Sequence, residues 1–129
     1  MTIEIVGQSY PAEYTVLTEE LLEKRYGGVE KVNEALQAAD VHGRSVEISE
    51  ILAALISGGV QREKEMCKIL GKEYSGPEAI DAKTIGLLMR PGQLYELLPQ
   101  IRDSIKEGYS PKIKLEPEKG KNGEAASSE

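Results

Sequence analysis

The chain has 129 residues, a formal net charge of −6 and a composition in which 40% of the residues are hydrophobic. This length fits a single domain, and the acidic balance argues against general binding to the phosphate backbone of nucleic acids. Phe and Trp are absent, so the core has to be built mainly from aliphatic side chains.

The N-terminal residues alternate between apolar and polar side chains, which is the period of a half-buried strand. Ile3 and Ile5 form the first alternating run, and Tyr14 and Val16 form the second. Gly7 and the glutamine that follows it can make the tight turn between the two runs. The pattern predicts an N-terminal β-hairpin.

Two helices are predicted to follow the hairpin. Thr18 is the predicted N-cap of the first, because two glutamates would then lie in its first turn, near the positive end of the helix dipole. Gly27 and Gly28 are predicted to end it and to form a tight joint to a second helix at residues 29–39. One apolar stripe continues across this joint through Leu22, Tyr26, Val29, Val32 and Leu36.

A connection at residues 40–45 is predicted to lead to the central helix, at residues 46–57. This helix carries almost no charge after Glu50, and its apolar face consists of Ile48, Ile51, Leu52, Leu55 and Ile56. Gly58 and Gly59 are predicted to end it. The more polar residues 60–70 are predicted to form a separate, peripheral helix.

Two helical regions are predicted after a polar loop. Asp81 can cap a short helix at residues 82–89, and Pro91 suits the first turn of the last helix, which reaches about residue 107. Pro99 falls inside the apolar pattern of that helix, so a kink or a helix in two parts is expected. The pattern itself consists of Leu94, Leu97, Leu98, Ile101 and Ile105.

These elements predict a mainly α (α+β) fold, in which the N-terminal β-hairpin is followed by a compact bundle of about five short helices. The predicted domain covers residues 1–111. Residues 112–129 contain few apolar side chains and are predicted to be a disordered tail.

The chain offers little of what catalysis or metal binding needs. Its single cysteine, Cys67, and its single histidine, His42, cannot form a Cys/His zinc site within one chain or an intrachain disulfide. His42 is expected to be a solvated loop residue, and Cys67 a small, partly buried one. No glycine-rich phosphate-binding motif is present. We therefore expect no enzymatic activity, no metal and no cofactor.

The sequence also predicts where the protein acts. No stretch approaches the roughly 18 apolar residues of a membrane span, and the first residues lack the basic and apolar regions of a signal peptide. A cytoplasmic protein without membrane association is expected.

Surplus apolar positions are the candidates for contact with a partner protein, although packing in the core is the alternative for each of them. A helix interrupted by Pro99 can present apolar side chains to a partner. The candidate partner-binding residues are Leu94, Tyr95 and Leu98, with Leu52 and Ile56 on the central helix as second choice.

Four segments carry a resemblance to a known family. They read YPAEYTVL at residues 10–17, LLEKRYGGV at 21–29, EILAALISGG at 50–59 and IDAKTIGLL at 80–88. Together they resemble the tail assembly chaperones of long-tailed bacteriophages and prophage-like elements, and the likeness spans about residues 3–108.

This resemblance implies a mainly helical, non-enzymatic protein that acts in the cytoplasm of a bacterial host. Such a protein binds the tape-measure protein while the tail forms, keeps its apolar helices from aggregating and helps to recruit tail-tube subunits. A chaperone that is displaced later is expected to bind in many weak copies, so a homo-oligomer or a multi-copy assembly is expected. The alternative is a small bacterial adaptor or regulatory protein that binds one folded partner.

Overall fold

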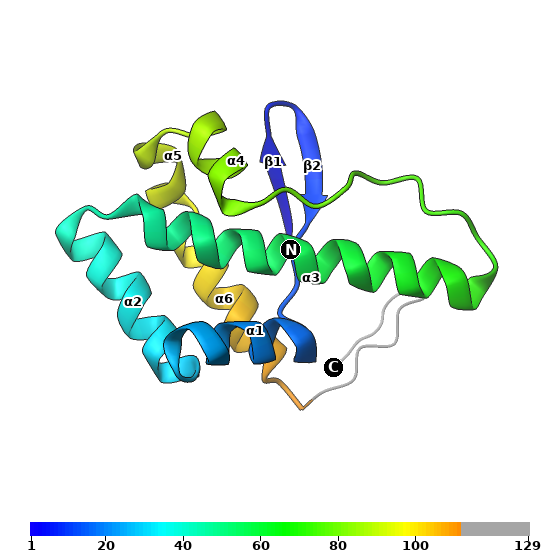
Figure 1. The fold of residues 1–129 in the computed structure, drawn as a ribbon, viewed down its shortest axis with the longest axis horizontal. Coiled ribbons are helices and arrows are strands. Elements are labelled where there is room, and N and C mark those ends of the chain that lie inside the picture. Colours follow the sequence, from blue (N-terminus) through cyan, green and yellow to red (C-terminus); the bar gives the residue numbers. More distant parts are fainter. Residues whose placement is uncertain (112–129) are drawn as a thin grey trace, which may run out of the picture.

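The computed structural model describes residues 1–111 and confirms the predicted fold class, a mainly helical chain with an N-terminal antiparallel hairpin (Figure 1). The predicted tail at residues 112–129 lies outside the described residues. The elements in chain order are β1 (Thr2–Ile5), β2 (Gln8–Pro11), α1 (Val16–Tyr26), α2 (Val29–His42), α3 (Ser45–Leu70), α4 (Ala82–Leu88), α5 (Pro91–Glu96) and α6 (Leu98–Gly108).

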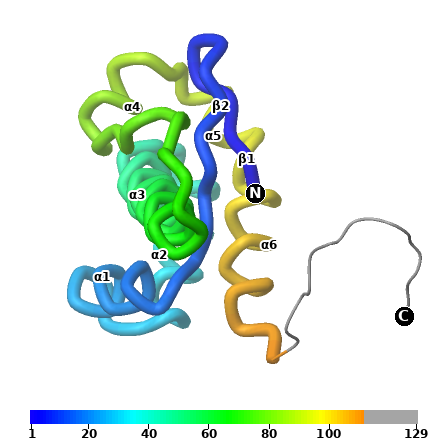
Figure 2. Tube along the Cα trace, turned by 90° about the vertical axis from the view of Figure 1, so that its right-hand side faces the viewer, coloured from blue at the N-terminus to red at the C-terminus, as the bar shows by residue number. Residues whose placement is uncertain are grey.

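Helix α3 is the centre of the fold. It runs across the middle of Figure 1, with α1 and α2 on one side and α4, α5 and the hairpin on the other. Helices α1, α2, α4 and α5 and strand β2 all contact it. Figure 2 shows the link from β2 to α1 passing between α3 and α6. The core is almost entirely aliphatic, and the predicted apolar face of the central helix, from Ile48 to Ile56, is fully buried in it.

The hairpin forms, but it is shorter than the alternation predicts. Ile3 pairs with Tyr10 and Ile5 pairs with Gln8, and the side chains of Ile3 and Ile5 are buried. The turn is made by Val6 and Gly7, both with positive φ (52° and 77°), and not by Gly7 and Gln8. Two successive residues with positive φ are what a two-residue hairpin turn requires.

The prediction that Tyr14 and Val16 belong to the second strand is wrong. Strand β2 ends at Pro11, which pairs with Thr2, and the last contact with the N-terminus is the hydrogen bond that the backbone N–H of Ala12 donates to the carbonyl oxygen of Met1 at 2.8 Å. The chain then turns to α3, where the backbone N–H of Glu13 donates to the carbonyl oxygen of Leu55 at 2.9 Å. Val16 is the first residue of α1.

Helix α1 begins one turn earlier than predicted. Its N-cap is Thr15, whose Oγ1 accepts from the backbone N–H of Thr18 at 3.2 Å. The Thr18 hydroxyl is instead buried and donates to the carbonyl oxygen of Glu13 at 3.3 Å. The predicted joint at Gly27 and Gly28 is confirmed, because α1 ends and α2 begins on either side of it, with φ values of 101° and 136°.

The prediction that Gly58 and Gly59 end the central helix is wrong. Helix α3 passes through both and continues to Leu70, so residues 60–70 are its second half and not a separate helix. A Cβ atom at Gly58 would lie 2.6 Å from the carbonyl oxygen of Glu13, and one at Gly59 would collide with the backbone of Pro11. Because these glycines have no side chain, the segment from Pro11 to Glu13 can cross directly over α3, and the helix continues through them.

The other helix ends are close to those predicted. Helix α2 extends to His42, which leaves a shorter connection to α3 than residues 40–45. Asp81 caps α4, its Oδ1 accepting from the backbone N–H of Thr84 at 2.8 Å. Pro91 lies in the first turn of α5, and the last helical region is divided near Pro99 into α5 and α6.

Candidate functional site

Four of the five predicted partner-binding residues lie inside the core. Leu52, Ile56, Leu94 and Leu98 are buried, so they cannot contact a partner while the domain is folded. Only Tyr95 keeps part of its surface exposed, and its ring packs on the edge of the core. The apolar spacing that singled out these positions is therefore explained by packing, and the surface of the folded domain has to supply the candidate site.

The first turns of α1 expose apolar side chains that lie outside the predicted partner-binding positions. Val16 is 78% exposed, Leu17 63% and Leu21 51%, whereas Leu22 on the same helix is buried. The signal was present in the sequence, because α1 carries apolar residues on its outer side as well as on its core stripe. Exposed apolar side chains that gather on one edge of a helix are typical of protein-binding surfaces.

Two hollows lie along the boundary between α1 and α3. The first, of about 590 Å³, has Val16 and Leu17 of α1 on one side and residues from Gly58 to Lys68 of α3 on the other. The second, of about 510 Å³, lies between Leu21 of α1, Ser57 of α3 and the residues that begin α4. Leu17 and Leu21 are one helical turn apart. We call this surface the α1–α3 groove: Val16, Leu17 and Leu21 form its apolar edge, and Ser57, Gln61, Arg62, Lys64, Glu65 and Lys68 line it from α3.

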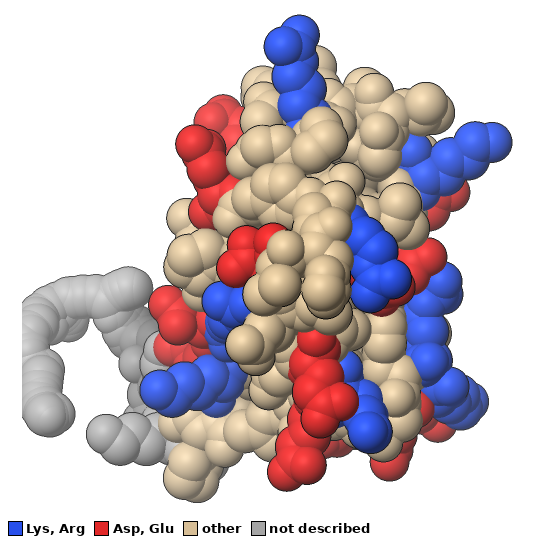
Figure 3. All heavy atoms as spheres, turned by 90° about the vertical axis from the view of Figure 1, so that its left-hand side faces the viewer, with Lys and Arg blue, Asp and Glu red and all other residues tan. Residues whose placement is uncertain are grey.

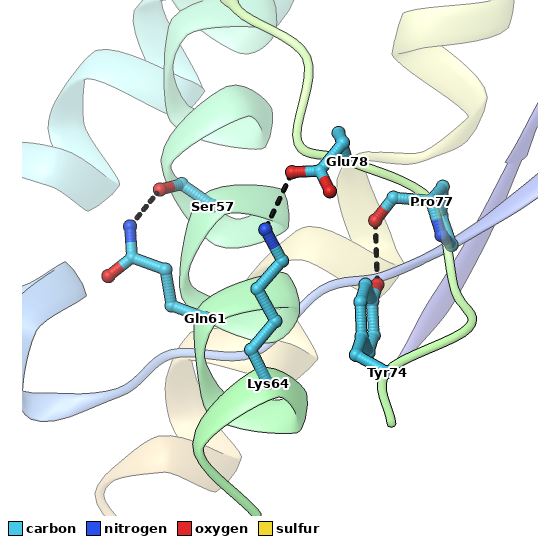
Figure 4. A network of polar contacts seen from close by, with 6 residues as sticks. All are labelled: Ser57, Gln61, Lys64, Tyr74, Pro77 and Glu78. Atoms are coloured by element: carbon cyan, nitrogen blue, oxygen red, sulfur yellow. Dashed lines mark hydrogen bonds and ion pairs between the residues drawn. The ribbon is translucent and has the colours of Figure 1, made fainter. Parts of the chain in front are cut away.

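Polar contacts fix the α3 side of the α1–α3 groove and the segment that returns from α3 to α4 (Figure 4). The side-chain amide of Gln61 donates to Ser57 Oγ at 2.9 Å. Lys64 Nζ lies 2.6 Å from a carboxylate oxygen of Glu78, and Tyr74 donates its hydroxyl to the carbonyl oxygen of Pro77 at 2.6 Å. Of these contacts, the ion pair between Lys64 and Glu78 joins the returning segment to α3.

Charge is distributed unevenly between the groove and another face of the molecule. The first hollow is lined by three basic residues of α3, Arg62, Lys64 and Lys68, and by one carboxylate, Glu65. The second hollow is lined by equal numbers of basic residues (Arg25 and Lys83) and acidic residues (Glu50 and Asp81). Lys64 and Lys68 have carboxylate partners, whereas Arg62 has no ion-pair partner among residues 1–111. On the face that Figure 3 shows, basic and acidic side chains are interspersed. The groove thus has a basic edge on a chain of net charge −6.

A tyrosine cluster joins the end of α6 to the start of α1. The hydroxyls of Tyr14 and Tyr109 lie 3.0 Å apart, and Tyr109 donates to Glu19. Burial raises the pKa of Tyr14, and burial followed by the hydrogen bond to Glu19 raises that of Tyr109. Burial, and then the nearby charges of Glu47 and Glu50, raise the pKa of Tyr26 in the same way. All three tyrosines keep their protons at neutral pH and act as hydrogen-bonding contacts between helices.

Within the described part of the chain, no group of three or more His, Cys, Asp or Glu side chains is placed to hold a metal ion. Among residues 1–111, no helix has both the length and the apolar character to cross a membrane. No protein-family model matches the chain, and neither a curated protein nor a solved structure matches it.

Proposed function

We propose that the protein is a non-enzymatic tail assembly chaperone of a bacteriophage or prophage, which binds the tape-measure protein and helps to recruit tail-tube subunits. The observation that carries the proposal is the apolar edge of the α1–α3 groove, formed by Val16, Leu17 and Leu21. These residues belong to two of the segments, 10–17 and 21–29, that resemble the family. They are thus both part of the resemblance and available on the surface.

The physical basis of such a function is the temporary covering of apolar helices. Burying apolar surface contributes about 25 cal/mol per Å², so a small groove binds one helix weakly. Weak sites in many copies along a long partner give strong but reversible binding overall. An acidic surface outside the groove keeps the assembly dissolved in the bacterial cytoplasm.

Co-expression tests the proposal. The protein is produced together with a candidate tape-measure protein, the product of any long, helix-rich open reading frame next to its gene, and the partner's solubility and the size of the complex are measured. We expect the partner to be soluble only in the presence of this protein, in a large complex that contains several copies of it. An unchanged solubility of the partner, with this protein eluting alone, would contradict the proposal and favour an adaptor protein with one folded partner.

A variant comparison tests whether the apolar edge is the contact surface. The double substitution Leu17→Asp and Leu21→Asp should abolish the effect on solubility, because it places two charges on that edge. The control is Leu87→Asp on α4, where the leucine is similarly exposed at 77%. If the double variant still keeps the partner soluble, the chaperone function stands and the contact surface lies elsewhere.

A further inference from the structure

We propose that the α1–α3 groove binds an amphipathic helix that has an apolar stripe and an acidic edge. The inference rests on the proposed function only for the origin of that helix, which would be the tape-measure protein. The groove itself specifies the chemistry, because it combines an apolar edge on α1 with a basic edge on α3.

The shape of the groove favours a helix as the occupant. The exposed side chains of Leu17 and Leu21 are one turn apart on α1, so they can contact apolar residues that are one turn apart on a partner helix. The α3 segment from Ser57 to Lys68, which lines the other side, is about 16 Å long at the usual rise of a helix. Three turns of a partner helix match this length.

The charges of the groove favour an acidic edge on that helix. Lys64 is engaged by Glu78 and Lys68 by Glu65, which leaves Arg62 as the basic residue of α3 in the groove that has no ion-pair partner among residues 1–111. An exposed guanidinium can bind a carboxylate through two parallel hydrogen bonds. A nucleic acid or a lipid surface fits less well, because three basic residues beside an apolar edge are too few on an acidic chain.

Synthetic peptides of about 18 residues, or five turns, test the proposal with the full chain. The first carries leucines at one-turn spacing and glutamates along one edge. The second has lysines in place of the glutamates, and the third has the composition of the first with the leucines scrambled. Affinity is measured by fluorescence anisotropy, and the contact surface is mapped by amide chemical shifts of the isotope-labelled protein.

We expect the glutamate peptide to bind about tenfold more tightly than the lysine peptide, and the preference to shrink at about 0.5 M salt. The scrambled peptide should bind more weakly than either. The largest amide shifts should fall on Leu17, Leu21, Ser57 and Gln61.

Two substitutions with matched controls sharpen the test. Arg62→Glu should weaken binding of the glutamate peptide about tenfold and strengthen binding of the lysine peptide, whereas Lys106→Glu on α6 should change neither. Leu17→Asp should weaken both peptides, and Leu87→Asp should not. Leu17→Asp is not expected to unfold α1, because an acidic residue in the first turn is favourable there.

Equal affinity for the glutamate and lysine peptides, or amide shifts confined to α4, would overturn the proposal. Its failure is distinguishable from failure of the proposed function. If the wild-type protein keeps the tape-measure protein soluble but shows no preference among the peptides, the inference about the groove is wrong and the chaperone function stands. If the peptides bind as expected but the tape-measure protein stays insoluble, the inference about the groove stands and the proposed chaperone function is wrong.

Discussion

The two halves of α3 have similar backbones and opposite surroundings. From Ile48 to Val60 the helix is covered by other helices and by the crossing link, whereas from Gln61 to Leu70 no residue is buried. The second half nevertheless stays helical, ending at Gly71, whose φ of 69° permits the left-handed cap. Helix α3 therefore continues beyond the last residue that it contributes to the hydrophobic core, Val60.

The largest expected effect comes from removing core side chains in the first half. Ile51→Ala should lower the free energy of unfolding by about 4 kcal/mol, because it deletes buried methyl groups and leaves a cavity. Ile69→Ala, the same change on the second half, should alter it by less than about 0.5 kcal/mol. Ile51 is 0% exposed and Ile69 82%. Urea denaturation measures both, and equal losses would show that the second half is covered as well.

The boundary between the halves supplies the second prediction. Gly59→Ala should destabilise the domain by about 2–3 kcal/mol, because its Cβ would collide with the backbone of Pro11, which exceeds the gain in helix propensity. The control is Gly86→Ala on α4, where nothing lies within 4 Å of the added Cβ. That variant should be neutral or more stable by up to about 1 kcal/mol. A neutral Gly59→Ala would contradict the close crossing of α3.

A smaller effect is expected where the returning segment rests on the second half. Tyr74→Phe removes the hydrogen bond to the carbonyl oxygen of Pro77 and should cost about 1 kcal/mol. Tyr10→Phe is the matched control, because the Tyr10 hydroxyl makes no hydrogen bond with another group among residues 1–111. Thermal denaturation monitored by circular dichroism compares the two variants. If they lose the same stability, the contact at Pro77 contributes nothing.

The smallest effect concerns pH and the tyrosine cluster at the start of α1. The pKa of Tyr109 is raised in the folded state, so the folded protein holds this proton more tightly than the unfolded chain does. The corresponding stability is present below about pH 10 and is lost as the pH rises above it. The free energy of unfolding should therefore fall as the pH rises above about 10, and Tyr109→Phe should make this fall shallower. An identical slope in the variant would contradict a role for Tyr109.

Local patterns predicted the type of most elements and missed long-range contacts. The apolar spacing from Ile48 to Ile56 gave the central helix, and the caps at Asp81 and Gly27 were recognisable from residue type. Gly59 could not be interpreted in this way. A glycine in a helical pattern can either end the helix or allow another backbone to pack closely against it. At Gly59 the second case holds because of Pro11, which is almost fifty residues away in the sequence.

The same limit applies to the candidate site. Apolar spacing identifies the side of a helix that contacts something, and for Leu52 and Leu98 that contact is the core. The exposed residues Leu17 and Leu21 lie off the stripe, so spacing alone did not select them. Finding them requires the position of α1 on α3, which the start of that helix at Thr15 helps to fix.

The crossing at Gly58 and Gly59 also fixes which side of α3 faces the chain that crosses it. The carbonyl oxygen of Leu55 accepts from the crossing chain, and only glycines fit directly beneath it. A slip of one residue would bring Ser57 or Val60 under that chain and rotate the helix by about 100°. Because only glycine fits at these two positions, Gly58 and Gly59 determine which residues of the 26-residue helix face the core and which line the groove.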